Sequence, residues 1–259
     1  MIKYPRTHHV VGSRLQHGDH NLAAIPFAAI CGQKLVVEEK MDGANTALSF
    51  TQAGELLLQS RGHYLTGGPR ERHFDLFKQW ANTHADTLHA ALGARFVMYG
   101  EWLYAKHTCF YDALPHYFME FDIYDRQERE FMSTHRRRQL LAGLPVVSVA
   151  VLWQGIANHL RELTSRVGPS LFKTSIWREA LLEAASAAGV GPEQVLAETD
   201  REDTMEGLYI KVEANGRVMQ RLKWVRPSFL SAIQDSGSHW LARPIIANKL
   251  ADGVDLWTA

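Results

Sequence analysis

The chain has 259 residues, of which 46% are hydrophobic and 22% are charged. This composition is ordinary for a globular protein with a buried core, and the length suits one large domain or two small ones. There are 28 basic and 28 acidic residues, so the net charge is zero. A protein that coats nucleic acid without specificity is usually basic overall, so any site for a polyanion must here be local.

The sequence shows no sign of export or of membrane insertion. No apolar run approaches the roughly 18 residues that a membrane span requires, and the N-terminal stretch has no apolar signal-peptide core. The two cysteines, Cys31 and Cys109, lie far apart, and the thirteen histidines are scattered. We therefore expect a cytoplasmic protein without a membrane segment and without a structural zinc site.

The first half of the chain is rich in predicted strands. Residues 34–41 and 44–51 alternate or run apolar on either side of Asp42-Gly43. This pattern predicts a hairpin, because Asp and Gly tolerate the positive φ of a tight turn. Further elements are a strand at 55–61, a helix at 70–92, strands at 95–103 and 117–125, and a short helix that Ser133 caps and that carries Arg136, Arg137 and Arg138 on a solvated face.

The second half combines helices with a second hairpin. Two alternating strands at 206–226 flank Asn215-Gly216, the preferred turn dipeptide. The other expected elements are a strand at 146–153, helices at 157–166 and at 175–198 with a break at Gly189–Pro192, and a helical segment at 227–250. With no repeat or linker, the simplest organisation is a single α+β domain over residues 1–259, with its core at 34–226.

Lys40 follows the first predicted strand in the sequence KMDGAN. A K-x-D-G match alone is weak, and by itself Lys40 reads as a solvated residue at a strand end. Taken singly, the charged residues that follow are also strand-end charges in solvent, and Phe121 is core packing. However, they come from distant segments and lie at the ends or on one face of predicted strands, so they can converge on one cleft. These residues are Arg61, Glu101, Phe121, Glu206, Arg221 and Lys223.

In this order and spacing, the set resembles the motif series of the covalent lysyl nucleotidyltransferases. That superfamily contains DNA ligases, RNA ligases and mRNA capping enzymes. Glu101 lies 61 residues and Glu206 lies 166 residues after Lys40, which is similar to the phage nick-sealing RNA ligases. The resemblance implies an adenylation domain of two antiparallel sheets flanked by helices, with the ATP cleft between the sheets.

The resemblance also implies a chemistry. A lysine amine, here Lys40, attacks the α-phosphorus of ATP to give a lysyl-AMP adduct, with Mg²⁺ or Mn²⁺ as the metal. Lys223 and Arg221 would assist catalysis, and Glu206 would hold the metal directly or through water. AMP then passes to an RNA 5′-phosphate, and a 3′-hydroxyl expels it to close the strand.

Further residues are expected around the nucleotide. Glu101 would accept hydrogen bonds from the ribose hydroxyls, Phe121 would stack on adenine, and Arg61 would position the nucleotide and the 5′-phosphate. His107 and Tyr111 are expected close by. The complete nucleotide-binding set is Glu39, Asn45, Arg61, Glu101, Phe121, Glu206 and Lys223.

Asn45 favours the RNA-ligase branch. DNA ligases and capping enzymes usually have arginine two residues after the motif glycine, whereas RNA ligases commonly have asparagine. Only 36 residues follow Lys223, too few for an OB-fold domain. We therefore expect an ATP-dependent RNA ligase for RNA repair, acting on RNA such as a nicked duplex, with an end-processing kinase or phosphatase as a partner. The alternatives are a minimal ATP-dependent DNA ligase and a non-catalytic nucleotide- or RNA-binding module.

Overall fold

A large, mainly antiparallel sheet organises the molecule. The computed structural model describes residues 1–15, 22–229 and 244–258. The main path of the sheet follows the order β4-β3-β5-β6-β7-β11-β10-β2-β9, with β1 beside β11 and β8 beside β6. The strands are β1 (His8–His9), β2 (Lys34–Glu39), β3 (Ala44–Phe50), β4 (Leu56–Ser60), β5 (Phe96–Trp102), β6 (Phe118–Asp125), β7 (Glu130–Met132), β8 (Val147–Ser148), β9 (Val151–Ile156), β10 (Gly207–Ala214) and β11 (Arg217–Val225).

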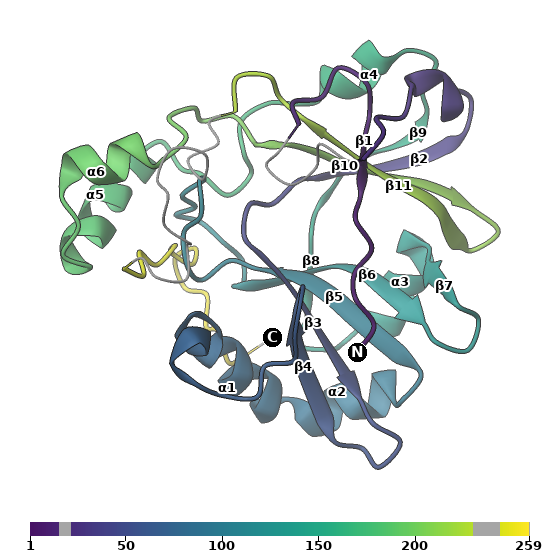
Figure 1. Ribbon diagram of the computed structural model, residues 1–259, viewed down its shortest axis with the longest axis horizontal. Coiled ribbons are helices and arrows are strands. Elements are labelled where there is room, and N and C mark those ends of the chain that lie inside the picture. Colours follow the sequence, from purple (N-terminus) through teal and green to yellow (C-terminus); the bar gives the residue numbers. More distant parts are fainter. Residues whose placement is uncertain (16–21, 230–243, 259) are drawn as a thin grey trace.

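The sheet has two halves, which Figure 1 shows as separate groups of strands: β3 to β6 in one, and β2, β9, β10 and β11 in the other. The short strand β7 joins them by pairing with both β6 and β11. Its register with β11 consists of two pairs, Arg217 with Met132 and Val218 with Phe131. The α+β class is confirmed, but two separate sheets are not, because one hydrogen-bonded path contains both halves.

The hairpin predicted at Asp42-Gly43 is wrong. Strand β2 pairs with β10 and β9, whereas β3 pairs with β4 and β5. Gly43 does not have a positive φ. Its missing side chain instead permits a close approach, because a Cβ there would lie 2.6 Å from the Trp102 carbonyl oxygen. Residues 40–43 therefore cross from one half of the sheet to the other, and Lys40 lies on this crossing.

The predicted hairpin at Asn215-Gly216 is confirmed. Strands β10 and β11 are antiparallel, and the two turn residues have φ values of 53° and 76°. The helix predicted at 70–92 is present in three pieces: η2 (Pro69–Phe74), α1 (Asp75–Thr83) and α2 (Ala85–Leu92). Ser133 caps α3 (Thr134–Leu141) as expected, since its side chain accepts a hydrogen bond from the Arg136 amide.

The helices described next lie in the second half of the chain, except for η1, which lies near the N-terminus. The predicted break at Gly189–Pro192 separates α5 (Trp177–Ala187) from α6 (Pro192–Ala197). The other two are α4 (Leu160–Thr164) and η1 (Phe27–Ala29). The helical segment expected at 227–250 falls mostly outside the described residues. Within 244–250 the expectation is wrong, because this stretch contains no helix and makes isolated bridges from Ala247 and Leu250.

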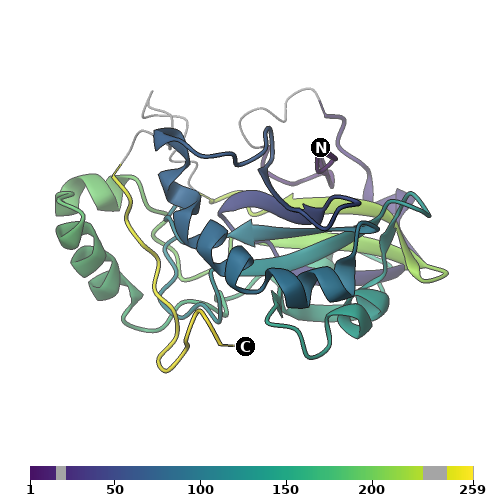
Figure 2. The same ribbon diagram turned by 90° about the horizontal axis from the view of Figure 1, so that it is seen from below.

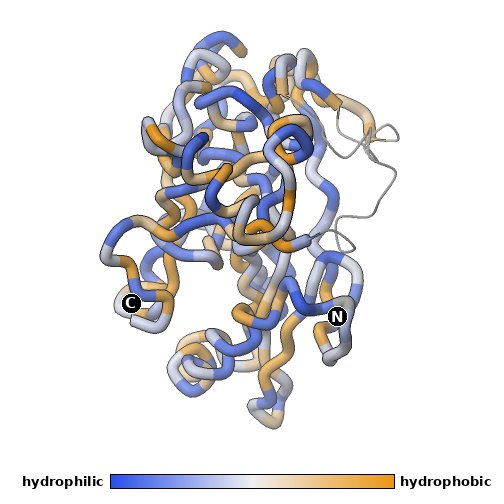
Figure 3. The backbone as a smooth tube through the Cα atoms, turned by 90° about the vertical axis from the view of Figure 1, so that its left-hand side faces the viewer, coloured by the Kyte–Doolittle hydropathy of each residue, from blue (hydrophilic) through white to orange (hydrophobic). Residues whose placement is uncertain are grey.

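Two apolar clusters stabilise the two halves. Helices α1 and α2 lie across one face of β3 to β6 (Figure 2), where Trp80 and Trp102 are buried with Phe77 and Phe118. A second cluster joins β2, β10 and β11. Hydrophobic and hydrophilic stretches alternate over short distances along the chain (Figure 3). Among the described helices, none is both long and apolar enough to cross a membrane.

Candidate functional site

A cavity of about 610 Å³ opens beside the crossing at residues 40–43. Its walls come from both halves of the sheet and from the N-terminal segment. Seven of the residues singled out from the sequence motifs line it: Glu39, Lys40, Asn45, Arg61, Glu101, Phe121 and Lys223. His107 lines it too, as expected.

Three other expected residues lie behind the cavity wall. Glu206 is buried next to Lys40, and Tyr111 is buried with its hydroxyl accepting a hydrogen bond from the Asp42 amide at 3.0 Å. Arg221 lies over the ring of Phe131, 3.8 Å from its centroid, and is not among the residues that line the cavity. The structure therefore brings Lys223 to the site and places Arg221 behind it.

Lys40 is held in an ion pair. Its Nζ atom donates to Glu206 Oε2 at 2.7 Å, and its backbone amide donates to the Gly207 carbonyl at 3.0 Å. Burial lowers the pKa of Lys40, but the carboxylates of Glu206, Asp42 and Glu101 together raise it more, and the net shift is upward. In the protein alone, Lys40 is therefore a protonated ammonium group.

Burial raises the pKa of two carboxyl groups beside Lys40, those of Glu206 and Glu101. Burial raises the pKa of Glu206 to about 7, although Lys40 opposes the shift. Burial likewise raises the pKa of Glu101 to about 7, against the charges of Lys40 and Arg61. Glu101 Oε1 also accepts a hydrogen bond from the Gly43 amide at 3.1 Å, which ties the end of β5 to the crossing. The site thus combines one amine with acids of perturbed pKa, a common feature of reactive sites.

Asp42 connects the crossing to the loop after β5. Its Oδ2 atom accepts hydrogen bonds from the amides of Thr108 and Cys109 at 2.7 and 2.6 Å. With the bond from the Asp42 amide to Tyr111, three hydrogen bonds hold this residue. The sequence suggested only a turn residue here, because its partners lie more than sixty residues away.

Glu39 points to another segment of the chain. Its carboxyl group accepts hydrogen bonds from the Ser170 hydroxyl at 2.5 Å and the Leu171 amide at 3.1 Å. Burial raises the pKa of Glu39 to about 7, and these hydrogen bonds act against the shift. Ser170 and Leu171 have no motif that could have marked them as support for the cavity.

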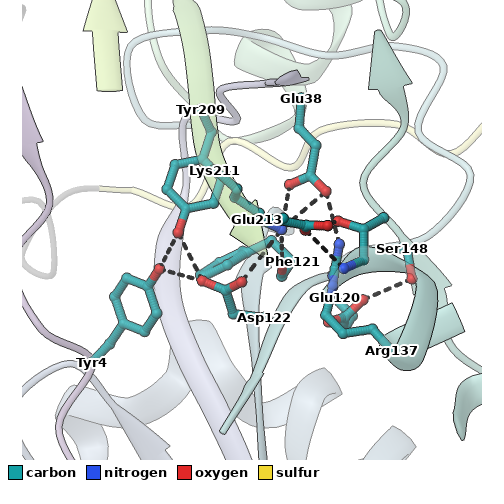
Figure 4. A network of polar contacts seen from close by, with 11 residues as sticks. Tyr4, Glu38, Glu120, Phe121, Asp122, Arg137, Ser148, Tyr209, Lys211 and Glu213 are labelled. Atoms are coloured by element: carbon teal, nitrogen blue, oxygen red, sulfur yellow. Dashed lines mark hydrogen bonds and ion pairs between the residues drawn. The ribbon is translucent and has the colours of Figure 1, made fainter. Parts of the chain in front are cut away.

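A buried charge network, drawn in Figure 4, adjoins the cavity through Glu38, which is one of the lining residues. Arg137 Nη2 is 2.8 Å from Glu38, and its Nη1 is 2.6 Å from Glu120. Lys211 is 2.9 Å from Glu38 and 3.3 Å from Asp122. All five side chains are fully buried, so the expectation that Arg137 lies on a solvated face is wrong.

Tyr4 of the N-terminal segment extends this network, as Figure 4 also shows. The hydroxyl groups of Tyr4 and Tyr209 both donate to Asp122 Oδ2, at 2.6 and 2.7 Å. The ring of Tyr4 packs edge-on against Phe121, with centroids 5.3 Å apart. Tyr4, Arg6 and Thr7 line the cavity. Sequence reasoning missed them because they precede the motif series.

Comparison with known proteins agrees with this fold. The profile of the RNA ligase family matches residues 33–225, so the chain belongs to the RNA ligase family. A comparison with curated proteins gave no match.

Solved structures of RNA ligases have a similar fold. An RNA ligase from Naegleria gruberi with AMP and Mn is 17% identical, with a TM-score of 0.58, covering 91% of this chain and 59% of that one. Another structure from N. gruberi, with ATP and Mn, is 19% identical, with a TM-score of 0.52 and coverages of 81% and 54%. An archaeal ATP-dependent RNA ligase is 15% identical, with a TM-score of 0.52 and coverages of 87% and 48%. The chain thus spans about half the length of these relatives.

Proposed function

We propose that this protein is an ATP-dependent RNA ligase that joins 5′-phosphate and 3′-hydroxyl ends through a lysyl-AMP intermediate. The observation that carries the proposal is the Lys40 amine in the wall of the cavity, paired with the buried Glu206 at 2.7 Å. Membership of the RNA ligase family and the ATP and AMP bound by the N. gruberi enzyme support it.

In the first step, Lys40 Nζ attacks the α-phosphorus of ATP. The N–P bond forms, the bond to the β-phosphate oxygen breaks, and pyrophosphate leaves. The amine must first lose its proton, because an ammonium group has no lone pair for attack. Glu206 is the group positioned to accept that proton, since it already holds Lys40 at 2.7 Å and its pKa of about 7 is poised for transfer.

Carboxylates near Lys40 offer oxygen ligands for a divalent cation that would arrive with the ATP phosphates. Asp42, Glu101 and Glu206 supply carboxylate oxygens, the ligand type that Mg²⁺ and Mn²⁺ prefer. No group of three or more His, Cys, Asp or Glu residues within 1–15, 22–229 and 244–258 is arranged to hold a metal. We therefore assign the cation to Glu206, directly or through water, together with the ATP phosphates. When bound, it would neutralise phosphate charge and favour the neutral amine.

The cavity provides groups for each part of the nucleotide. Phe121 offers a ring face for adenine, held from behind by Tyr4 and by Lys211, which donates to the Phe121 carbonyl at 2.5 Å. Glu101 can accept hydrogen bonds from the ribose hydroxyls, with Asn45 opposite it in the sheet register. Arg61 and Lys223 supply positive charge for phosphates. Glu39 borders the pocket, and Arg221 acts from behind the wall.

In the second step, AMP passes from Lys40 to the 5′-phosphate of an RNA end. In the third, a 3′-hydroxyl attacks that phosphate and AMP leaves. We assign residues 1–259 to one nucleotidyltransferase domain that acts in RNA repair in the cytoplasm, on ends that a kinase or phosphatase prepares. The two cysteines are free thiols, as in most proteins of a reducing compartment.

The test is transfer of label from ATP labelled at the α-phosphate. Wild-type protein with Mg²⁺ or Mn²⁺ should become labelled, and Lys40→Ala should abolish labelling. Lys34→Ala, an exposed lysine at the start of β2, is the matched control and should label normally. An unlabelled wild-type protein would refute the proposal. A second assay compares the sealing of nicked duplexes that carry RNA or DNA on the 3′-hydroxyl side of the nick. Preference for RNA on that side supports an RNA ligase, whereas equal sealing of the two duplexes would point to a DNA ligase.

A further inference from the structure

The C-terminal segment 246–251 lies along the loop at 103–111. This segment lies C-terminal to residues 33–225, which the RNA ligase family profile matches. Its backbone nevertheless pairs with the loop as a short strand would. The hydrogen bonds run from Lys106 N to Ile246 O (2.8 Å), Asn248 N to Tyr104 O (2.8 Å), Lys249 N to Tyr111 O (2.9 Å) and Leu114 N to Lys249 O (3.1 Å).

Asn248 makes the central contacts of this pairing. Its side chain accepts a hydrogen bond from the Tyr111 amide at 2.9 Å and donates one to the Leu103 carbonyl at 2.6 Å. Its carbonyl accepts a third from the Tyr117 hydroxyl at 2.9 Å. Asn248 is 1% exposed, so water cannot replace these bonds. One buried amide thus fixes both ends of the loop.

The loop in turn holds Asp42. The amides of Thr108 and Cys109 donate to its carboxylate, and the Tyr111 hydroxyl accepts from its amide. Asp42 lies two residues from Lys40 and is one of the charges that raise the Lys40 pKa. A continuous set of hydrogen bonds therefore runs from Asn248 to the crossing that carries the lysine.

We propose that Asn248 is a positioning residue for adenylylation of Lys40. It fixes the loop at 103–111, which fixes Asp42 and so the direction of the Lys40 amine. This inference rests on the proposed ligase function. Asn248 does not line the cavity and acts only through the loop. Displacement of a reacting group by about 1 Å can slow a reaction by roughly a hundredfold, so a distant brace can matter.

The test compares Asn248→Ala with Lys249→Ala. Lys249 lies on the same segment, but its side chain pairs with the exposed Glu183 on α5. We expect Asn248→Ala to slow single-turnover labelling at saturating ATP about tenfold, a typical cost for a supporting residue, with the ATP Kd changed less than about twofold. Lys249→Ala should label at the wild-type rate. Asn248→Asp keeps the acceptor for the Tyr111 amide, so its labelling rate should lie between those of Asn248→Ala and Lys249→Ala.

A double-mutant cycle separates positioning from general destabilisation. Tyr111→Phe removes the hydroxyl that binds the Asp42 amide, so the path from Asn248 to Asp42 is already weakened in that variant. If Asn248 acts along this path, Asn248→Ala should lower the labelling rate by less than about threefold when Tyr111→Phe is already present. If Asn248→Ala does not fold, Asn248→Asp takes its place in the same cycle.

Two results would overturn this inference without affecting the proposed ligase function. The first is labelling of Asn248→Ala at the rate of Lys249→Ala. The second is an equal loss of labelling rate on Asn248→Ala in the wild-type and Tyr111→Phe proteins. An unlabelled wild-type protein would overturn the proposed ligase function as well, which keeps the two failures distinct.

Discussion

Opposing electrostatic forces act on Lys40. Burial alone would favour the neutral, nucleophilic amine, but the nearby carboxylates of Glu206, Asp42 and Glu101 reverse the direction of its pKa shift. The protein without nucleotide therefore holds the lysine in an unreactive form. A cation entering the cavity with the nucleotide would compete with Lys40 for these carboxylates and favour the neutral amine. The resting ion pair would thus be broken only when substrate is bound.

Glu206→Gln should shift the acid limb of the adenylylation pH profile to lower pH. The substitution removes a carboxylate that raises the Lys40 pKa, so the amine becomes neutral at lower pH. Single-turnover labelling between about pH 6 and pH 10 measures the midpoint. The maximal rate should also fall, because Glu206 is the proposed metal and proton site. Glu193→Gln, exposed on α6, is the control and should leave the midpoint unchanged. An unmoved or higher midpoint in Glu206→Gln would contradict this account.

Glu39 should make the protein more stable in mild acid than at neutral pH. Its pKa is raised from 4.5 to about 7, so the folded state binds its proton more tightly than the unfolded state. The contribution is fully present below about pH 4.5 and is lost as pH rises to about 7. The destabilisation caused by Glu39→Gln should therefore become smaller across this window, by on the order of 3 kcal/mol. Urea unfolding at several pH values tests this, and a pH-independent difference would refute it.

At the scale of elements, buried ion pairs join the two halves of the sheet. Among the strands within 1–15, 22–229 and 244–258, backbone pairing between the halves runs only through the short strand β7. By contrast, Arg137 on α3 binds Glu38 of β2 and Glu120 of β6, which belong to different halves. Lys211 of β10 likewise binds Glu38 and Asp122 of β6. Because the cavity draws its walls from both halves, this network also fixes the cavity.

Arg137→Met should lower the free energy of unfolding by about 3–5 kcal/mol. The substitution leaves the buried carboxylates of Glu38 and Glu120 without the arginine that they share. Removing one partner of a buried ion pair destabilises a protein strongly, even where the intact pair contributes little to stability. Arg138→Met, on the exposed face of the same helix, is the control and should cost less than about 0.5 kcal/mol. Chemical denaturation of both variants provides the comparison. Equal stabilities would mean that the network does not join the halves.

Local signals in the sequence predicted elements well and strand partners poorly. Asn215-Gly216 and Ser133 act through their own backbone conformations and neighbours, so their turn and cap are confirmed. Asp42-Gly43 carries the same kind of signal, but β2 and β3 find partners elsewhere. Arg137 looked solvated because its partners lie far away in sequence. Motif order identified seven of the residues that line the cavity, whereas the residues that support them depend on long-range contacts.

At the scale of the whole molecule, charge is divided between regions. Arg6, Arg61, His63 and Lys223 line the cavity. Between residues 175 and 203, which include α5 and α6, there are two basic and seven acidic residues. These helices lie to one side of the sheet in Figure 1. The acidic residues of this region would repel phosphates. RNA should therefore approach from the cavity side.

Binding of a 5′-phosphorylated single-stranded RNA should consequently depend only weakly on salt. If Arg6, Arg61 and Lys223 each neutralise one phosphate, the slope of log K against log salt concentration should be about −2, since each contact on a single strand contributes roughly −0.7. Fluorescence anisotropy across a salt series measures this slope. Arg61→Ala should make it shallower by about 0.7, whereas Arg201→Ala, exposed within the acidic region, should leave it unchanged. A slope steeper than about −5 would require many more phosphate contacts with basic residues away from the cavity. It would contradict the inference that a protein without net charge binds RNA at a local site.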